Sequence, residues 1–355
     1  MSKKILITGG CGFVGSSLAI AIKSKYPNYE VIAFDNLKRR GSELNISRLK
    51  ELEIEFIHGD IRDKNDFEGI EGITTVIDAA AEPSVLAGID GGTDYLVGTN
   101  LIGTINALDF ARKNTSDFIF LSTSRVYPIP TIEKASFIEE ETRFSFTDSQ
   151  TVSGISSQGI SEKLPLEGSR SLYGATKLSS ELMIAEYSEF FGLNTVINRC
   201  GVISGPYQMG KVDQGVVVLW MARHFWKKGL GYFGYGGEGK QVRDILNVQD
   251  LFDLVDWQMH NMSQINGKTY NAGGGLSSSA SLQELTAICE EITGNKIDFK
   301  KVPETRAADL RIYITDNTKI TKELNWSPKV SVRQTMEEIF EWLKSNESSL
   351  KAILS

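Results

Sequence analysis

Cysteine is scarce in this chain, and its three residues, Cys11, Cys200 and Cys289, are widely spaced with no C-x-x-C pair. Such a set predicts a reducing compartment and no zinc site. The chain has no excess of positive charge, because its net charge is −7. A protein that binds nucleic acid needs a basic face, so the charge argues against such a surface. No run of about 18 apolar residues could cross a membrane, and the N-terminus leads straight into an apolar strand, without room for a signal peptide. We therefore expect a cytoplasmic protein with no metal and no membrane or nucleic-acid partner.

Internal repeats and low-complexity tracts are also absent, and 355 residues exceed one typical domain. Strand-like and helix-like segments alternate through the first 200 residues, which is typical of a parallel sheet with helices on both faces. Beyond Arg199 the alternation loosens and glycines cluster. The sequence therefore predicts a parallel α/β domain followed by a smaller mixed domain.

A glycine-rich turn follows the short apolar run Ile5–Ile7. G-x-G-x-x-G starts at Gly10 and G-x-x-G-x-x-G at Gly9, and both spacings share Gly12 and Gly15. Glycines in this context allow a tight turn, an approach of bare backbone to a pyrophosphate and close helix–strand packing. The alternative is a purely structural turn. We predict that a dinucleotide binds this turn, at Gly9, Gly12, Phe13, Val14 and Gly15.

The second apolar run, Val31–Phe34, ends at Asp35, which lies 20 residues past Gly15. A carboxylate at this position accepts hydrogen bonds from the ribose hydroxyls of NAD and repels the additional phosphate of NADP. We therefore predict NAD as the cofactor, with Asp35 and the adjacent Asn36 in its site. The cationic cluster Lys38–Arg40 leaves NADP open as an alternative.

Three further segments complete the predicted cofactor site. Asp60 follows the third apolar run and is a candidate for the adenine amino group, with Ile61 beside the ring. The alternative role for Asp60 is to cap the helix after it. The fourth strand, 75–81, ends in small residues that let the backbone pass beside the cofactor, and a helix follows over roughly 95–113. From these two segments we add Ala79, Ala80, Ala81 and Asn100.

Residues 129–170 are poorly periodic and rich in Ser, Thr, Gly and Glu. Because loops of this length are usually functional or mobile, we interpret the segment as an active-site loop, with disorder as the alternative. A helix is predicted over 171–190 and a further strand over 195–198.

Tyr173 and Lys177 are four residues apart, so a helix places them one above the other on the same face. An ammonium beside a phenol favours the phenolate, and the pair can act as a general base while the lysine holds the nicotinamide ribose. By itself the spacing is common and fits a surface pair. Here it follows a dinucleotide motif and a cluster of hydroxyls at the end of a strand, of which Thr123 is our candidate to bind the substrate oxygen and Ser124 the competitor.

Together these motifs resemble the extended short-chain dehydrogenase/reductase family, and the resemblance covers essentially the whole chain. It implies a Rossmann doubly wound sheet that binds NAD over residues 1–198, to which part of 240–272 returns. It also implies a smaller mixed α/β domain for a nucleotide-sugar over 199–355. In such a family member Tyr173 is the base, Lys177 orients NAD and favours the Tyr173 phenolate, and Thr123 polarises the sugar hydroxyl.

The C-terminal half is similar to the CDP-paratose/CDP-tyvelose 2-epimerase branch of that family. The combination of Asp213-Gln-Gly215 with Lys240-Gln-Val-Arg-Asp244 distinguishes the branch. The segments that carry the similarity are Arg199–Pro206, Asp213–Gly215, Gly239–Asp244, Asn271–Gly274 and Asn325–Lys329.

Two positions depart from the patterns of relatives. The 4,6-dehydratases carry Asp-Glu directly after the catalytic threonine, whereas this chain has Ser124 and Arg125, which disfavours dehydration. Many relatives bind the substrate phosphate with an asparagine three residues after the position of Arg199. Val202 stands there, so phosphate binding must be arranged differently.

Arg243 and Arg306 are the expected diphosphate ligands, because guanidinium forks fit phosphate oxygens in a bidentate manner. The alternative for each is a salt bridge, more so for Arg306, which has Asp309 and Arg311 nearby. The complete set of predicted substrate residues is Ser124, Gln214, Gln241, Arg243 and Arg306.

These motifs predict an epimerase that oxidises a sugar hydroxyl to a ketone and returns the hydride to the other face, inverting one carbon. The branch resemblance places that carbon at C2 of a CDP-sugar. A UDP-hexose 4-epimerase, another nucleotide-sugar oxidoreductase, and a non-catalytic NAD-binding protein are the alternatives. The resemblance also implies a homodimer packed through the helices at 95–113 and 173–190, or a homotetramer built on it.

Overall fold

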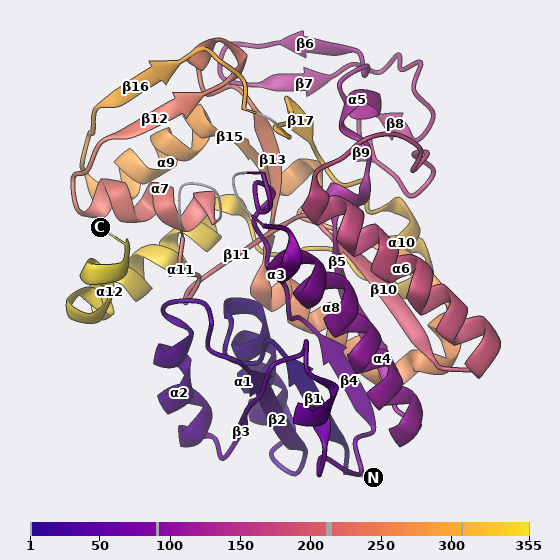
Figure 1. Cartoon of the computed structure of the whole chain (residues 1–355). Coiled ribbons are helices and arrows are strands. Elements are labelled where there is room, and N and C mark those ends of the chain that lie inside the picture. The colour runs from indigo at the N-terminus through magenta and orange to yellow at the C-terminus, as the bar shows by residue number, and fades with distance from the viewer. Residues whose placement is uncertain (1, 90–91, 211–214, 307, 355) are drawn as a thin grey trace. The chain divides into compact units, whose positions relative to one another are not determined.

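The computed structural model describes residues 2–89, 92–210, 215–306 and 308–354. Its contacts divide the chain into two units, whose elements are labelled in Figure 1. Unit 1 consists of Met1–Val126, Leu172–Arg199 and Leu251–Tyr270, and unit 2 of Tyr127–Ser171, Cys200–Asp250 and Asn271–Ser355. The segment 129–170, which we expected in the first domain, belongs to unit 2 by its contacts.

Within the described residues, the main sheet has seven strands in the order β14-β10-β5-β4-β1-β2-β3. β1 pairs in parallel with both β2 and β4, so the strand order reverses beside β1. In doubly wound sheets, ligands bind at the carboxyl ends of the strands where this reversal occurs. The predicted Rossmann-type α/β fold is confirmed. The strands are β1 (Lys4–Thr8), β2 (Glu30–Asp35), β3 (Glu55–His58), β4 (Thr75–Asp78), β5 (Asp117–Thr123), β10 (Thr195–Cys200) and β14 (Lys268–Ala272).

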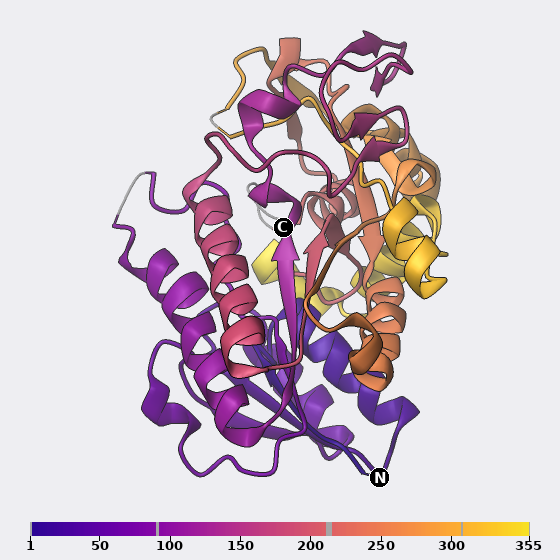
Figure 2. The ribbon, with the colours of Figure 1, turned by 90° about the vertical axis from the view of Figure 1, so that its right-hand side faces the viewer.

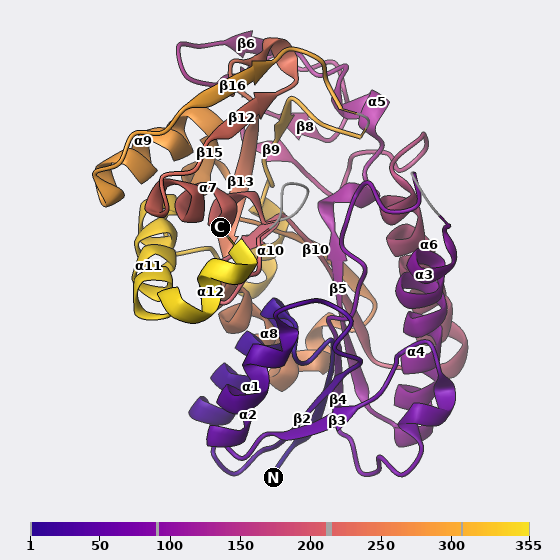
Figure 3. The ribbon, with the colours of Figure 1, turned by 60° about the vertical axis from the view of Figure 1, so that its left-hand side comes forward.

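Helices cover both faces of this sheet. Figure 3 shows α1, α2 and α8 on one face and α3, α4 and α6 on the other, and α6 lies beside α4 in Figures 2 and 3. The apolar core contains Leu6, Val76 and Phe118 from three neighbouring strands, together with residues of α4 and α6. The helices are α1 (Phe13–Lys25), α2 (Asn45–Glu51), α3 (Asp94–Val97), η3 (Gly98–Ile102), α4 (Gly103–Asn114), α6 (Leu172–Phe191) and α8 (Val248–Ile265).

The predicted helix over 95–113 is present, but it is not uniform. α3 and α4 are joined through η3, a five-residue π-helical turn that contains Asn100. π-Helical turns are rare in proteins, and those that occur are often found at functional sites. The apolar periodicity of the sequence does not predict this turn.

Unit 2 is a mixed α/β unit, as predicted. β13 pairs in parallel with β11 and β17 and antiparallel with β15, while β12 and β16 form a separate parallel pair. The strands are β11 (Val202–Ser204), β12 (Leu230–Phe233), β13 (Val242–Asn247), β15 (Ser279–Ser281), β16 (Phe299–Val302) and β17 (Ile312–Tyr313). The helices are α7 (Val216–Phe225), α9 (Leu282–Thr293), α10 (Thr318–Leu324), α11 (Val332–Ser345) and α12 (Glu347–Leu354).

The segment 129–170 has regular structure, which corrects its interpretation as a single irregular loop. It contains α5 (Ile129–Ile132) and the hairpins β6–β7 (Phe137–Glu139, Phe144–Phe146) and β8–β9 (Ile155–Ser156, Gly159–Ile160). The amide of Ile160 donates to the carbonyl of Ile314 at 2.8 Å, so this segment is bonded to the C-terminal part of unit 2. Strands of two or three residues are too short to show alternation in a sequence.

Among the described residues, none of the helices combines the length and the apolar character needed to cross a bilayer.

Candidate active site

The glycine turn between β1 and α1 is closely packed. A Cβ on Gly15 would lie 2.2 Å from the Gly9 carbonyl oxygen, and one on Gly10 would lie 2.5 Å from the Ala33 Cα. Gly9 has φ of +64°, which favours glycine. Gly12 precedes α1, and in the described structure no side chain caps the first N–H groups of that helix. Phe13 and Val14 begin the helix, so these N–H groups can bind an anion as the sequence predicts.

Asp35 lies at the end of β2 and is bonded to the glycine turn. Its Oδ2 accepts from the amide of Cys11 at 3.0 Å and its Oδ1 from the amide of Leu37 at 2.7 Å. Burial raises the pKa of Asp35, while these backbone N–H groups act in the opposite direction. Burial, assisted by the Asp35 charge, raises the pKa of Cys11 to about 12, so this thiol is protonated at neutral pH and is no nucleophile. The predicted ribose ligand and the predicted pyrophosphate site are thus next to each other.

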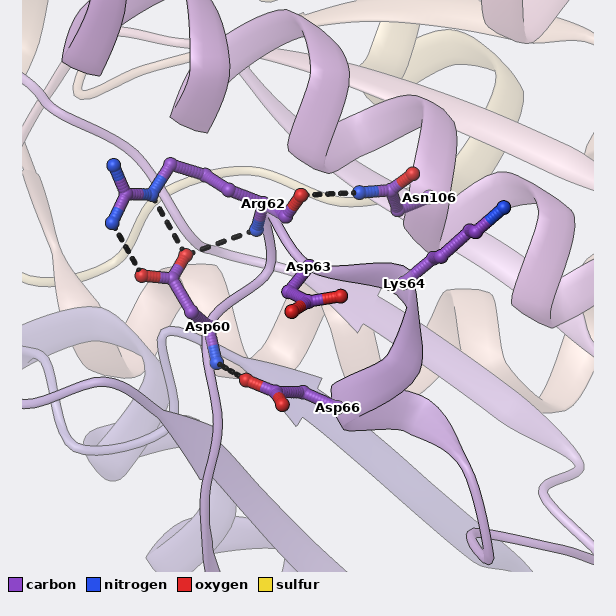
Figure 4. Close-up of a pocket in the computed structure, with 6 residues that line it drawn as sticks. All are labelled: Asp60, Arg62, Asp63, Lys64, Asp66 and Asn106. Carbon is purple, nitrogen blue, oxygen red and sulfur yellow. Dashed lines mark hydrogen bonds and ion pairs between the residues drawn. The ribbon is translucent and has the colours of Figure 1, made fainter.

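Asp60 is held by an ion pair with Arg62, as Figure 4 shows. The guanidinium donates from Nε at 2.9 Å and from Nη2 at 2.7 Å, and Asn36 donates to the Asp60 Oδ2 at 3.0 Å. These donors, Arg62 above all, hold the pKa of Asp60 well below its usual range. The capping alternative is wrong, because it is Asp63 that caps the short helix η2 (Lys64–Phe67). Contact with adenine stays a prediction for Asp60.

The same segment borders a polar pocket, drawn in Figure 4. Ile61 is buried beside Gly103, and its carbonyl accepts from the Asn106 amide at 2.9 Å. The lining residues are Asp60, Arg62, Asp63, Lys64, Asp66 and Asn106.

The three alanines predicted to border the cofactor follow β4 directly. A Cβ on Gly9 would lie 2.9 Å from the Ala79 carbonyl oxygen. The amide of Ala80 donates to Thr8 Oγ1 at 3.3 Å, and this hydroxyl donates to the buried Asp78 at 2.6 Å. The segment Ala79–Ala81 therefore lies against the glycine turn, at the reversal point of the sheet.

Asn100 makes protein contacts on both sides of its amide. Its Oδ1 accepts from the amide of Glu82 at 2.8 Å, and its Nδ2 donates to the carbonyl of Glu82 at 3.1 Å and to Thr176 Oγ1 at 3.3 Å. The side chain is completely buried. Asn100 thus holds the backbone that follows Ala81 and links it to α6.

The predicted catalytic side chains come from α6 and from the end of β5. Tyr173 and Lys177 are 9% and 1% exposed, which rules out the solvent-exposed surface pair. The Lys177 ammonium lies 3.8 Å from the centroid of the Phe120 ring on β5. Thr123 is half-buried and accepts from the amide of Arg125 at 3.2 Å, whereas Ser124, in the short helix η4 (Ser124–Val126), is buried. Thr123 is therefore the more accessible of the two hydroxyls.

Two of the predicted substrate residues in unit 2, Gln241 and Arg306, contact Phe233. The Arg306 guanidinium lies 3.9 Å from the Phe233 ring centroid, and the Gln241 amide donates to the Phe233 carbonyl at 2.8 Å. Arg243 on β13 forms an ion pair of 2.7 Å with Asp309. The sequence left a salt bridge with Asp309 open as the alternative for Arg306, whereas in the structure Asp309 pairs with Arg243. Asp213 and Gln214 lie outside the described residues.

Comparison with known proteins shows the family of this chain. The pattern of the NAD dependent epimerase/dehydratase family matches residues 5–273. The chain belongs to this family. The family assignment confirms the resemblance drawn from the motifs, and it confirms that the protein is an enzyme with NAD as its cofactor.

Individual members of the epimerase/dehydratase family align over nearly their whole length. The CDP-paratose 2-epimerase of Salmonella typhi is 35% identical over 96% of this chain and 99% of that protein. A dTDP-glucose 4,6-dehydratase of Actinoplanes sp. is 29% identical over 97% and 99%. The solved UDP-glucuronic acid 4-epimerase of Bacillus cereus, in complex with UDP-glucuronic acid and NAD, is 25% identical with a TM-score of 0.77, over 96% and 99%.

Proposed function

We propose that this enzyme inverts C2 of a CDP-sugar, in the manner of the conversion of CDP-paratose to CDP-tyvelose. The observation that carries the proposal is the 35% identity to a CDP-paratose 2-epimerase over almost the full length of both chains. The motifs in the C-terminal half that resemble the same branch add to it.

The chain's own residues perform the proton chemistry in this proposal. NAD supplies the hydride acceptor and later the hydride donor. Tyr173, as the phenolate, removes the proton of the sugar hydroxyl and later returns it, while Lys177 favours the phenolate and holds the nicotinamide ribose. Thr123 donates to the sugar oxygen. The keto sugar turns between the two steps, so the hydride returns to its opposite face.

The residues after Thr123 favour epimerisation over dehydration. Removal of water needs an acid and a base beside the sugar, and this chain has Ser124 and Arg125 at those two positions. We assign the diphosphate to Arg243 and Arg306, because guanidinium groups bind phosphate oxygens strongly. The Arg243–Asp309 pair holds one of these guanidinium groups in a fixed orientation.

We also propose that the enzyme is a cytoplasmic homodimer formed through unit 1. Large apolar side chains of α6 and η3 are exposed, including Leu182 at 63% and Phe190 at 74%. These two helices pack against each other, and exposed apolar side chains that gather on one face mark an interaction site. The others on these two helices are Ile102, Leu172 and Phe191.

Purified enzyme should be incubated with CDP-paratose and with UDP-glucose, and C2 and C4 of the products read by NMR. Inversion at C2 of the CDP-sugar supports the proposal, and inversion at C4 of the UDP-sugar alone identifies a UDP-hexose 4-epimerase.

Tyr173→Phe should lower kcat by about 10²- to 10⁴-fold with an unchanged thermal unfolding curve, since it removes only the acid–base group. A Tyr173→Phe enzyme of near-normal activity contradicts the mechanism.

A further inference from the structure

A buried ion pair joins α6 to two strands of the main sheet. The carboxylate of Glu181 on α6 accepts from Arg199 on β10, with Nη2 at 2.7 Å and Nε at 3.0 Å from Oε2. The same carboxylate accepts from the hydroxyl of Ser122 on β5. The Arg199 and Glu181 side chains are 9% and 5% exposed. One carboxylate thus connects a helix with two strands in the interior.

The connected segments are those that carry the predicted catalytic groups. Glu181 is four residues past Lys177 and eight past Tyr173 on the same helix, and Ser122 directly precedes Thr123. Other bonds tie α6 to its neighbouring helical segments, through Ser180 to the Asn100 carbonyl at 2.7 Å and through Tyr187 to Asp109 at 2.8 Å. The Glu181 contacts are different in kind, because they tie α6 to the strands.

A buried ion pair is weak evidence for stability, since burying two charges costs about as much as their attraction returns. Its well-documented use is to specify one register among several apolar packings. A guanidinium fork on a carboxylate fixes both distance and plane. Rotation or sliding of α6 against β5 or β10 breaks these bonds at once, whereas apolar contacts tolerate it.

We infer that Glu181 and Arg199, together with Ser122, are positioning residues that hold Tyr173 and Lys177 in register with Thr123. The inference rests on the proposed function of those three groups. It assigns a role to Glu181 and Arg199, for which the sequence motifs predicted none.

The test replaces both charges by apolar side chains of similar length, in Glu181→Met/Arg199→Met. The double variant leaves no unpaired buried charge, so it should fold with a thermal unfolding curve close to that of the parent. Its kcat should fall on the order of 100-fold, because a misplacement of about 1 Å costs that much. KM for the sugar and Kd for NAD should change less than about threefold, since a loss confined to the transition state lowers kcat alone.

The matched control is Lys25→Met/Asp256→Met, which removes an ion pair of 2.7 Å between α1 and α8, on the opposite face of the same sheet. It should keep the parental kcat. A folded Glu181→Met/Arg199→Met enzyme with parental kcat overturns the inference. If that variant does not fold, Ser122→Ala decides, because it removes just the bond from β5: a lower kcat at constant KM supports the inference and an unchanged kcat overturns it.

The turnover of the Tyr173→Phe variant is measured in the same assay. If Tyr173→Phe retains turnover, the proposed function itself is wrong. If Tyr173→Phe is inactive while the double variant is fully active, the positioning role alone is wrong.

Discussion

At the scale of single residues, both backbone groups of Cys11, the N–H and the carbonyl, are hydrogen-bonded to side chains. Its amide donates to Asp35 at 3.0 Å, and its carbonyl accepts from the Asn45 amide at 2.9 Å. The glycine turn therefore has little freedom to relax when a side chain is added. Gly15 is its tightest position, with the Gly9 carbonyl oxygen 2.2 Å from a Cβ placed there.

Gly15→Ala should therefore disturb both folding and cofactor binding. Overpacking of this kind costs about 1–3 kcal/mol, and the shift of the turn should weaken NAD binding about tenfold or more. Thermal unfolding and titration calorimetry with NAD measure the two effects. Gly92→Ala is the control, because a Cβ there has nothing within 4 Å. Equal NAD affinity in the Gly15 and Gly92 variants would contradict the role of the turn.

His224 is a buried histidine in α7, and its Nδ1 donates to the Trp220 carbonyl at 2.7 Å. Burial lowers its pKa from the ordinary value of 6.5, while the Trp220 carbonyl and Glu290 act in the opposite direction. The unfolded chain consequently takes up a proton at pH values where the folded chain remains neutral. Stability from this group is complete above about pH 6.5 and falls as the pH drops below it, down to the folded pKa.

His224→Phe should remove this part of the pH dependence. We expect the unfolding temperature of the parent to decrease between pH 7.5 and pH 5.5 by more than that of the variant, by calorimetry in buffers of equal ionic strength. Parallel curves for the parent and the His224 variant would show that His224 makes no contribution.

At the scale of helices and strands, the apolar patterns predicted most of unit 1. The runs at Ile5–Ile7 and Val31–Phe34 became β1 and β2, since strands buried on both faces have continuous apolar sequences. The helix predicted over 171–190 became α6. The hairpins within 129–170 were missed, because their strands are shorter than any readable period.

The candidate site was predictable where a local spacing encodes it. The glycine turn, Asp35 and the Tyr173–Lys177 pair lie within one or two adjacent elements, so their relation shows in the sequence. The sequence did not predict the ion pairs Arg243–Asp309 and Glu181–Arg199, because the partners are distant in sequence and are brought close by the fold. Long-range ion pairs leave no periodic signal.

At the scale of the whole molecule, the exposed apolar face of α6 predicts how the enzyme assembles. Leu182 is 63% exposed, and Leu182→Glu places a charge in the proposed dimer interface. The proposal predicts that in analytical ultracentrifugation the parent sediments as a dimer or a tetramer and the variant, at the same concentration, as a monomer. Lys344→Glu, on α11 of unit 2, is the control and should assemble like the parent. An unchanged assembly of the Leu182 variant would place the interface elsewhere.

In the proposed mechanism, one sugar carbon is inverted by oxidation and re-reduction with the same hydride. In this scheme the C2 hydrogen leaves as hydride and returns to the same carbon, so it never exchanges with solvent. The decisive measurement is proton NMR of CDP-paratose turned over in deuterium oxide without added NAD. We predict CDP-tyvelose with a full proton signal at C2; loss of that signal to deuterium, or no inversion at C2, would contradict the claim.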